Sequence, residues 1–115
     1  MIEVLYSDDD VLVVDKPSGM AVHPSPGFER GTMTDELARR FPKMAGVGSR
    51  ERPGVVHRLD VETSGVMVFA LTQRAYLRLR ERFESHAGVT KTYLAVLHGS
   101  PKGRKGTVDT LLGKR

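Results

Sequence analysis

Residues 57–65 read H-R-L-D-V-E-T-S-G, the densest group of reactive side chains in the chain. A β-branched pair at 55–56 precedes this stretch, and a six-residue apolar run at 66–71 follows it. Short apolar runs bounded by polar residues are typical of buried strands, so we expect a polar turn between two strands. Such strands hold the side chains of the turn in place, which favours a reactive or binding site there.

The segments before this turn also indicate strands. Residues 2–6 alternate weakly between apolar and polar, and residues 11–14 form an apolar run after an acidic turn. A turn at 16–19 then leads into an extended segment at 20–23. Near the other end of the chain, residues 89–97 are β-like.

Two helices are expected between these segments. Thr32 and Asp35 have the spacing of a capping box, and apolar residues follow at every fourth position until Pro42 ends the helix. Thr72 can cap a second helix that ends before Gly88. Residues 43–54 are rich in Gly, Arg and Pro and predict a basic loop. The fold class expected is α+β, a mixed and largely antiparallel sheet with two helices.

Composition is that of one globular domain spanning residues 1–115. Hydrophobic residues make up 39% and charged residues 28%, and no apolar stretch is long enough to span a bilayer. The first residues lack the features of a signal peptide, so we expect a cytoplasmic protein without membrane contact. Cysteine is absent, which excludes disulfides and cysteine metal sites, and we expect no bound metal.

The charge balance is compatible with a polyanionic partner. Eighteen Lys and Arg residues against fourteen Asp and Glu give a net charge of +4, and twelve of the eighteen are Arg. The isoelectric point is near 9.7. Arginine suits phosphate forks and base stacking, although a basic composition alone is a weak indicator of nucleic-acid binding.

Asp60 is the first candidate for chemistry. A turn aspartate commonly hydrogen-bonds to its own backbone, and that alternative needs no reaction. Arg58 nearby would favour the ionised carboxylate, and Thr63 and Ser64 could donate hydrogen bonds to it. An ionised and oriented carboxylate can act as a nucleophile or a general base.

The chain also carries three motifs in a fixed order. D-K-P-S-G stands at 15–19, H-R-L-D-x-x-T-S-G at 57–65 and K-T-Y-L-A-V-L-H-G at 91–99. Together they resemble the motifs of the RluA-type pseudouridine synthases, and they cover essentially the whole chain. The resemblance implies an enzyme that converts uridine to pseudouridine in ribosomal or transfer RNA, without a cofactor.

The resemblance assigns roles to Asp60 and to two residues of the third motif, Lys91 and Tyr93. Asp60 corresponds to the catalytic aspartate, which is open to attack at C1′, attack at C6 or abstraction of the 2′ proton. Tyr93 would stack on the flipped uracil and assist removal of the C5 proton, and Lys91 lies on the same strand face as an RNA contact. The alternative for Tyr93 is a core tyrosine with its hydroxyl at the surface.

Arg58, Lys16 and His57 are the remaining candidates for RNA or substrate binding. Arg58 is similar to the family's arginine at the flipped substrate, where a planar guanidinium can brace the gap and bind phosphate. The alternative is an ion pair with Glu62 or Asp60. The alternative for Lys16 is a residue that only solvates its turn, and a single histidine beside a strand is more often packed than catalytic.

A stripe of arginines on the second predicted helix is a feature that does not depend on the family resemblance. Arg74, Arg78 and Arg82 recur at every fourth position and therefore share one side of the helix. A phosphate backbone could neutralise them, but Glu81 and Glu84 lie near enough to do the same. A solvated face is the favoured interpretation.

The resemblance stops before the end of the chain. An H-Q-I-R-like motif, expected to complete the uracil pocket, does not follow Gly99. We therefore expect the chain to be the N-terminal part of a catalytic domain, inactive by itself and prone to self-association through exposed sheet edges. The competing hypotheses are an RNA-binding fragment without turnover and a domain with a structural role.

Overall fold

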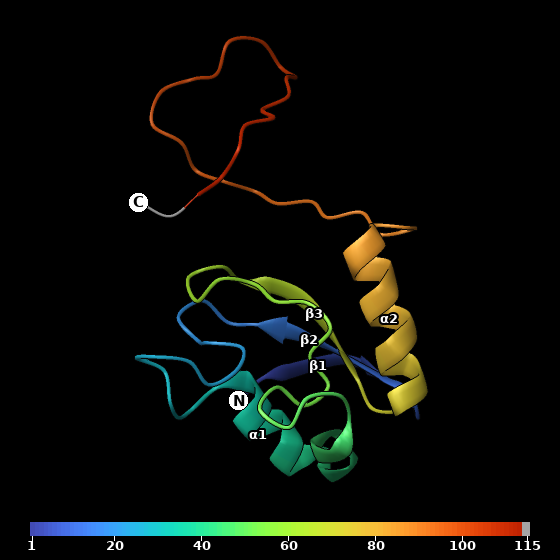
Figure 1. The fold of residues 1–115 in the computed structure, drawn as a ribbon. Helices are drawn as coiled ribbons and strands as arrows, with labels where there is room; N and C mark the ends of the chain where they lie inside the picture. Colours follow the sequence, from blue (N-terminus) through green and yellow to red (C-terminus); the bar gives the residue numbers. More distant parts are fainter. Residues whose placement is uncertain (114–115) are drawn as a thin grey trace.

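The computed structural model describes residues 1–113, and it confirms the α+β class with an antiparallel sheet and two α-helices (Figure 1). The elements follow the order β1 (Glu3–Ser7), β2 (Val11–Lys16), α1 (Met33–Arg40), the 3-10 helix η1 (Pro42–Gly46), β3 (Gly65–Ala70) and α2 (Gln73–Ser85). The strands lie in the order β1-β2-β3, so β2 is central and both pairings are antiparallel. In the described part of the chain, no helix is both long and apolar enough to cross a membrane.

The register between β2 and β3 places the two functional motifs side by side. Val13 pairs with Val68, and at the end of the ladder Lys16 pairs with Gly65. Because Gly65 is the last residue of the H-R-L-D-V-E-T-S-G stretch, the end of β2 lies against the end of that stretch. Residues 15–19 and 57–65, which are some forty positions apart in sequence, thus meet at one edge of the sheet.

The two faces of the sheet pack against different helices. Met67 and Phe69 point to one face, where they join the core with Met33 and Leu37 of α1. Ala70, on the other face, packs with α2 and neighbouring segments. The members of the two buried clusters are Ile2, Leu12, Val14, Val22, Met33, Leu37, Met44, Met67, Phe69 and Leu71 on the first side, and Val47, Val56, Ala70 and Tyr76 on the second.

Both predicted helix starts are confirmed. The N–H of Thr32 donates to Asp35 Oδ2 at 3.1 Å and its hydroxyl accepts from the N–H of Asp35, which completes the capping box of α1. The hydroxyl of Thr72 accepts from the N–H of Ala75 at the start of α2. The helix ends two residues before the predicted end at Ala87, because α2 stops at Ser85 and His86 is its left-handed C-cap, with φ 58°.

The extended segment expected at 20–23 does not join the sheet. The carbonyls of Ala21 and Val22 accept hydrogen bonds from the N–H groups of Met33 and Thr34, at 2.9 and 3.0 Å. The first N–H groups of a helix lack partners inside the helix, so this segment satisfies the start of α1 instead of a strand. Part of the loop expected at 43–54 is also ordered, as η1.

The strand expected at 55–56 is reduced to a single bridge between Val55 and Phe69. The carbonyl of Gly54 accepts from the N–H of Ala70 at 2.9 Å, but the N–H of Val68 donates to the side chain of His57. A side chain therefore takes the position that backbone would occupy in a ladder. This geometry stops the strand and releases residues 57–64 as a loop.

The strand predicted at 89–97 is wrong for the described chain. These residues are irregular and exposed, and Figure 1 shows the segment running away from the sheet and helices. Leu94 and Val96 are fully exposed. A strand needs a neighbour for its N–H and carbonyl groups, and in residues 1–113 none lies beside this segment.

Gly54 offers a test of how tightly the loop before residue 57 packs. It has φ +70°, and an added Cβ would lie 2.6 Å from the Ala70 carbonyl oxygen and 2.7 Å from Met44 Cγ. We expect Gly54→Ala to lower the free energy of unfolding by about 3 kcal/mol, through left-handed strain and overpacking.

Gly31 is the matched control, since it has φ +69° and open space around its Cα among the described residues. Gly31→Ala should cost only the backbone strain, about 1 kcal/mol. Urea unfolding of both variants measures the difference. Equal losses would show that contact with β3 does not constrain the loop.

Candidate active site

Lys16 fixes the loop that carries Asp60. Its side chain is fully buried, and Nζ donates to the carbonyl oxygens of Pro17, Val61 and Thr63 at 2.9, 2.9 and 2.7 Å. Three donations use all three N–H groups of an ammonium, so the geometry requires the charged form. Two of the acceptors lie just beyond Asp60 in sequence.

The turn after Lys16 reinforces this attachment. The N–H of Gly19 donates to the carbonyl of Val61 at 2.7 Å, and the hydroxyl of Ser18 donates to the carbonyl of Glu62 at 2.7 Å. The backbone of residues 61–63 is therefore held by residues 16–19 at three consecutive carbonyls. Sequence reasoning predicted that this turn lies near the site, but not that it binds the loop through its backbone.

Two effects on the pKa of Lys16 oppose each other: burial and the neighbouring carboxylates. Burial lowers the pKa of Lys16 from its ordinary value of 10.5, because an ammonium loses hydration in the interior. The carboxylates of Glu62 and Asp60 act in the opposite direction and favour the charged form. All three N–H groups are used within the fold, so in this conformation Lys16 positions the loop; its predicted contact with RNA stays a prediction.

Asp60 is exposed at the tip of this fixed loop. Its backbone carbonyl accepts from the N–H of Thr63 at 3.0 Å, which closes a turn. The hydrogen bonds expected from Thr63 and Ser64 to its carboxylate are not made within residues 1–113, nor is an ion pair with Arg58. The loop thus fixes the backbone beside Asp60 and leaves the carboxylate open to a ligand.

His57 attaches the start of the loop to β3. Its Nε2 accepts from the N–H of Val68 at 3.1 Å, and its ring stacks on Phe83 with centroids 4.2 Å apart and planes 4° apart. Burial, and then the charge of Lys91, lowers the pKa of His57 from 6.5 to about 4. The imidazole is therefore neutral at pH 7, and accepting at Nε2 places its proton on Nδ1.

The structure does not bring Lys91 and Tyr93 together beside Asp60. Lys91 is exposed, with Nζ 5.6 Å from the centroid of the Phe83 ring, so it lies near His57. Tyr93 is 58% exposed in the irregular C-terminal segment. The prediction that these two residues share a strand face is wrong here, because the strand is not formed.

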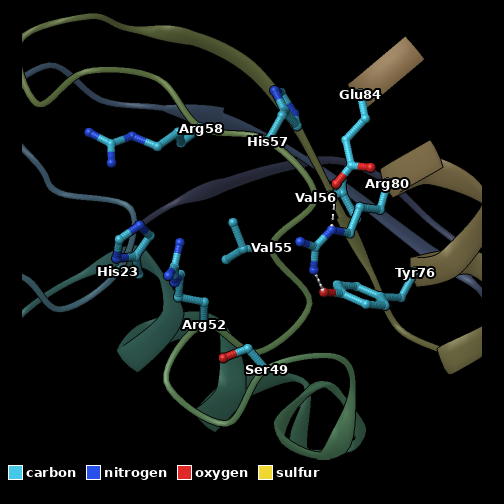
Figure 2. Close-up of a pocket in the computed structure, with 10 residues that line it drawn as sticks. All are labelled: His23, Ser49, Arg52, Val55, Val56, His57, Arg58, Tyr76, Arg80 and Glu84. Carbon is cyan, nitrogen blue, oxygen red and sulfur yellow. Dashed lines mark hydrogen bonds and ion pairs between the residues drawn. The ribbon is translucent and has the colours of Figure 1, made fainter. Parts of the chain in front are cut away.

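A basic cleft lies between the loop 49–58 and α2 (Figure 2). Its volume is about 280 Å³, and its lining combines three arginines with one glutamate. The lining residues are His23, Ser49, Arg52, Val55, Val56, His57, Arg58, Tyr76, Arg80 and Glu84. A smaller hollow of about 30 Å³ shares His23 and Arg58 with it and also contacts Leu59 and Val61, the neighbours of Asp60.

Sequence reasoning found only Arg58 and His57 of this cleft and missed the cation contributed by α2. The stripe of Arg74, Arg78 and Arg82 is solvent-exposed, and Arg74 lies 3.7 Å from Asp10 as a surface ion pair. Arg80 lines the cleft instead. The available signal was its position four residues from both Tyr76 and Glu84, which places all three on one side of the helix.

The chain belongs to the RNA pseudouridylate synthase family, whose model matches residues 10–115. It is 38% identical over 98% of its length to an uncharacterized RNA pseudouridine synthase of Synechocystis sp.. It is also 38% identical, over 98% of its length, to ribosomal large subunit pseudouridine synthase D of Zymomonas mobilis. These matches confirm the resemblance inferred from the three motifs.

The relatives are longer than this chain. The chain spans 34% of the Synechocystis protein and 35% of the Zymomonas protein, about a third of each. Among solved structures, it is similar to human RNA pseudouridylate synthase domain containing 4, with a TM-score of 0.54 and 33% identity. That match covers 72% of this chain and 30% of the human chain.

Replacing Lys16 tests its attachment of the loop. Lys16→Met keeps the length of the side chain but removes a donor from the carbonyls of Pro17, Val61 and Thr63, of which Val61 keeps the N–H of Gly19. We expect the free energy of unfolding to fall by about 3 kcal/mol, because partly buried carbonyls lose a charged donor. Lys43→Met, which removes an exposed ammonium bonded to the Asp9 carbonyl, should change stability little. Equal effects in urea unfolding would contradict the role of Lys16.

His57 should make stability depend on pH. With a folded pKa of about 4 against 6.5 when unfolded, the unfolded state binds more protons between these values. Stability contributed by neutral His57 is therefore lost as pH falls from 6.5 to 4, by about 2 kcal/mol after solvent screening.

The measurement is urea unfolding of the wild type and His57→Gln at pH 7, 6 and 5. The difference between the two proteins should change in favour of the variant as pH falls. His98→Gln, which removes an exposed imidazole, is the control and should follow the wild type. Parallel curves for wild type and His57→Gln would show that His57 is not held neutral.

Proposed function

We propose that this chain is the Asp60-bearing part of an enzyme that isomerises uridine to pseudouridine in RNA. The observation that carries the proposal is the attachment of residues 61–63 to Lys16, Ser18 and Gly19. This attachment holds the backbone beside Asp60 while its carboxylate stays exposed. Membership of the RNA pseudouridylate synthase family supports the same chemistry.

The reaction needs a carboxylate at the nucleoside. The bond between C1′ and N1 breaks, the uracil turns and a bond forms between C1′ and C5; C5 then loses its proton and N1 takes one up, so that product and substrate have the same composition. Asp60 serves this sequence by attack at C1′, attack at C6 or abstraction of the 2′ proton, and the three roles remain open. The reaction needs no redox cofactor, because the nucleoside neither gains nor loses electrons overall.

Arg58 and Tyr93 are the proposed partners of Asp60. Arg58 lies two residues from it and lines the cleft, where a planar guanidinium can bind phosphate or replace a flipped base. Tyr93 would reach the uracil only if residues 89–97 packed beside the sheet. We propose that the part of the relatives absent from this chain supplies the neighbouring strand that this packing requires.

The proposed substrate is ribosomal RNA in the cytoplasm. Several relatives carry the name ribosomal large subunit pseudouridine synthase D, among them proteins of Zymomonas mobilis and Xanthomonas campestris, the latter 48% identical over 86% of this chain. Transfer RNA is the second candidate that the family resemblance offers. The net charge of +4 suits either polyanion.

A second candidate function is RNA binding without turnover by the 115-residue chain. The observation that favours it is the exposure of Tyr93, which leaves Asp60 without its proposed aromatic partner. We expect the isolated chain to form no pseudouridine.

We also propose that the chain self-associates through the edge strand β1, where Leu5 and Tyr6 are 48% and 54% exposed.

The experiment joins residues 1–115 to the remaining residues of the Zymomonas mobilis relative, in place of its matching segment. This chimaera should form pseudouridine in ribosomal RNA, measured by mass spectrometry, with the parent relative as positive control. Asp60→Asn should lower turnover by about 10³-fold or more while sparing RNA affinity, because the amide cannot act as nucleophile or base.

Glu62→Gln is the matched control, since it removes an exposed carboxylate from the same loop. It should keep turnover within about threefold of the unaltered chimaera, because its backbone carbonyl still accepts from Ser18. Full activity in Asp60→Asn would refute the assignment of Asp60. A folded chimaera that binds RNA without forming pseudouridine would favour the second candidate function.

A further inference from the structure

The basic cleft between the loop 49–58 and α2 has a surplus of positive charge. Arg52, Arg58 and Arg80 line it against the single carboxylate of Glu84. His57 adds no charge, because burial keeps its imidazole neutral. An anion that enters the cleft therefore meets two more cations than acids.

Arg80 is oriented before any ligand arrives. Its Nε donates to Glu84 Oε1 at 2.9 Å, Nη1 donates to the hydroxyl of Tyr76, and Cζ lies 5.7 Å from the centroid of the Tyr76 ring. These contacts use two of the five N–H groups of a guanidinium. The remaining groups are available to a ligand, and Figure 2 shows the guanidinium reaching from α2 toward Val55.

The opposite wall is fixed relative to α2. The N–H of Gly48 donates to Gln73 Oε1 at 2.9 Å, which joins the loop to the first turn of the helix. The carbonyl of Arg52 accepts from the N–H of Val55 at 3.2 Å and holds this part of the loop in a turn. Arg52 and Arg80 therefore face the cleft from two walls that the hydrogen bond between the Gly48 backbone and the Gln73 side chain holds together.

A smaller hollow lies beside the cleft and shares His23 and Arg58 with it. Its lining includes Leu59 and Val61, the sequence neighbours of Asp60. A ligand lying over the Asp60 loop could thus extend past Arg58 into the space between Arg52 and Arg80. A single small anion would fill one part of this path, whereas a strand with repeated phosphates would follow all of it.

We propose that the cleft between the loop 49–58 and α2 binds a backbone phosphate of the RNA strand flanking the target uridine, with Arg52 and Arg80 as its ligands. Forked guanidinium groups bind phosphate oxygens in pairs, and two arginines of the lining offer such groups. This inference rests on the proposed function, because it takes the uridine to lie at Asp60. Glu84 orients Arg80 and at the same time weakens the attraction for the anion.

The test measures the affinity of the 115-residue chain for a fluorescein-labelled, uridine-containing 12-nucleotide RNA by fluorescence anisotropy at several salt concentrations. Arg52→Gln and Arg80→Gln should each weaken binding about tenfold at low salt. Each should also reduce the slope of log affinity against log salt by about 0.7, the loss of one phosphate contact on a single strand.

Arg78→Gln is the matched control. It removes the same charge from the same helix, but Arg78 lies two residues before Arg80 and so about 200° around the helix axis. It should leave the salt slope unchanged. Equal losses in Arg78→Gln and Arg80→Gln, unchanged binding in both cleft variants, or no RNA binding by the wild type would each overturn the proposal.

Glu84→Gln gives a change of opposite sign that loss of folding cannot imitate. Removing its charge should tighten RNA binding about threefold, because it lies in the cleft beside Arg80. Weaker or unchanged binding would count against the cleft. This variant decides the matter if Arg80→Gln proves too unstable to measure.

Two further comparisons separate the sources of phosphate and the two proposals. In ¹⁵N–¹H spectra, the Arg80 Nε–H signal should shift with the RNA at far lower concentration than with inorganic phosphate. A shift with inorganic phosphate alone would overturn RNA as the ligand.

The chimaera separates the two proposals. If it is active and Arg80→Gln leaves its RNA affinity unchanged, only the proposal for the cleft is refuted. If it is inactive and its RNA affinity depends on Arg52 and Arg80, only the proposed enzymatic function is refuted.

Discussion

The ammonium of Lys16 is fully buried, and its three N–H groups donate to the carbonyls of Pro17, Val61 and Thr63. Burying a charge is costly unless hydrogen bonds replace its lost water, so these residues must keep their relative positions. The end of β2 and the loop after Asp60 are consequently held together. A lysine in the interior thus does what a packed apolar residue could not, because it binds backbone atoms directionally.

His57 applies a similar constraint at the other end of the loop. Its Nε2 accepts a hydrogen bond from the N–H of Val68 on the outer edge of β3, and its ring stacks on Phe83 of α2. The loop is therefore attached to the central strand through Lys16 and to the edge strand and helix through His57. Arg58 and Asp60 lie between these two attachments, where they are exposed but their backbone is restrained.

Local sequence predicted most elements of the fold. The capping box of Thr32 and Asp35, the cap at Thr72 and the apolar runs of β2 and β3 act over a few residues, so their signals are complete within a short window. The strand prediction for residues 89–97 was wrong because a β-like sequence forms a strand only beside another strand, which the described chain does not offer. Arg80 was missed because the arginine periodicity of α2 says nothing about which side faces the loop 49–58.

Residue identity and spacing were enough to predict the family, the order of its three motifs and Asp60 as the candidate catalytic carboxylate. The contacts of Lys16 and His57 could not be predicted in this way, since their partners are backbone groups as many as 47 positions away and a backbone carbonyl carries no sequence signal. The packing of the folded chain also sets which arginines share a cleft. That assignment follows from how α2 packs against the loop, through contacts such as Gly48 with Gln73 that no periodicity encodes.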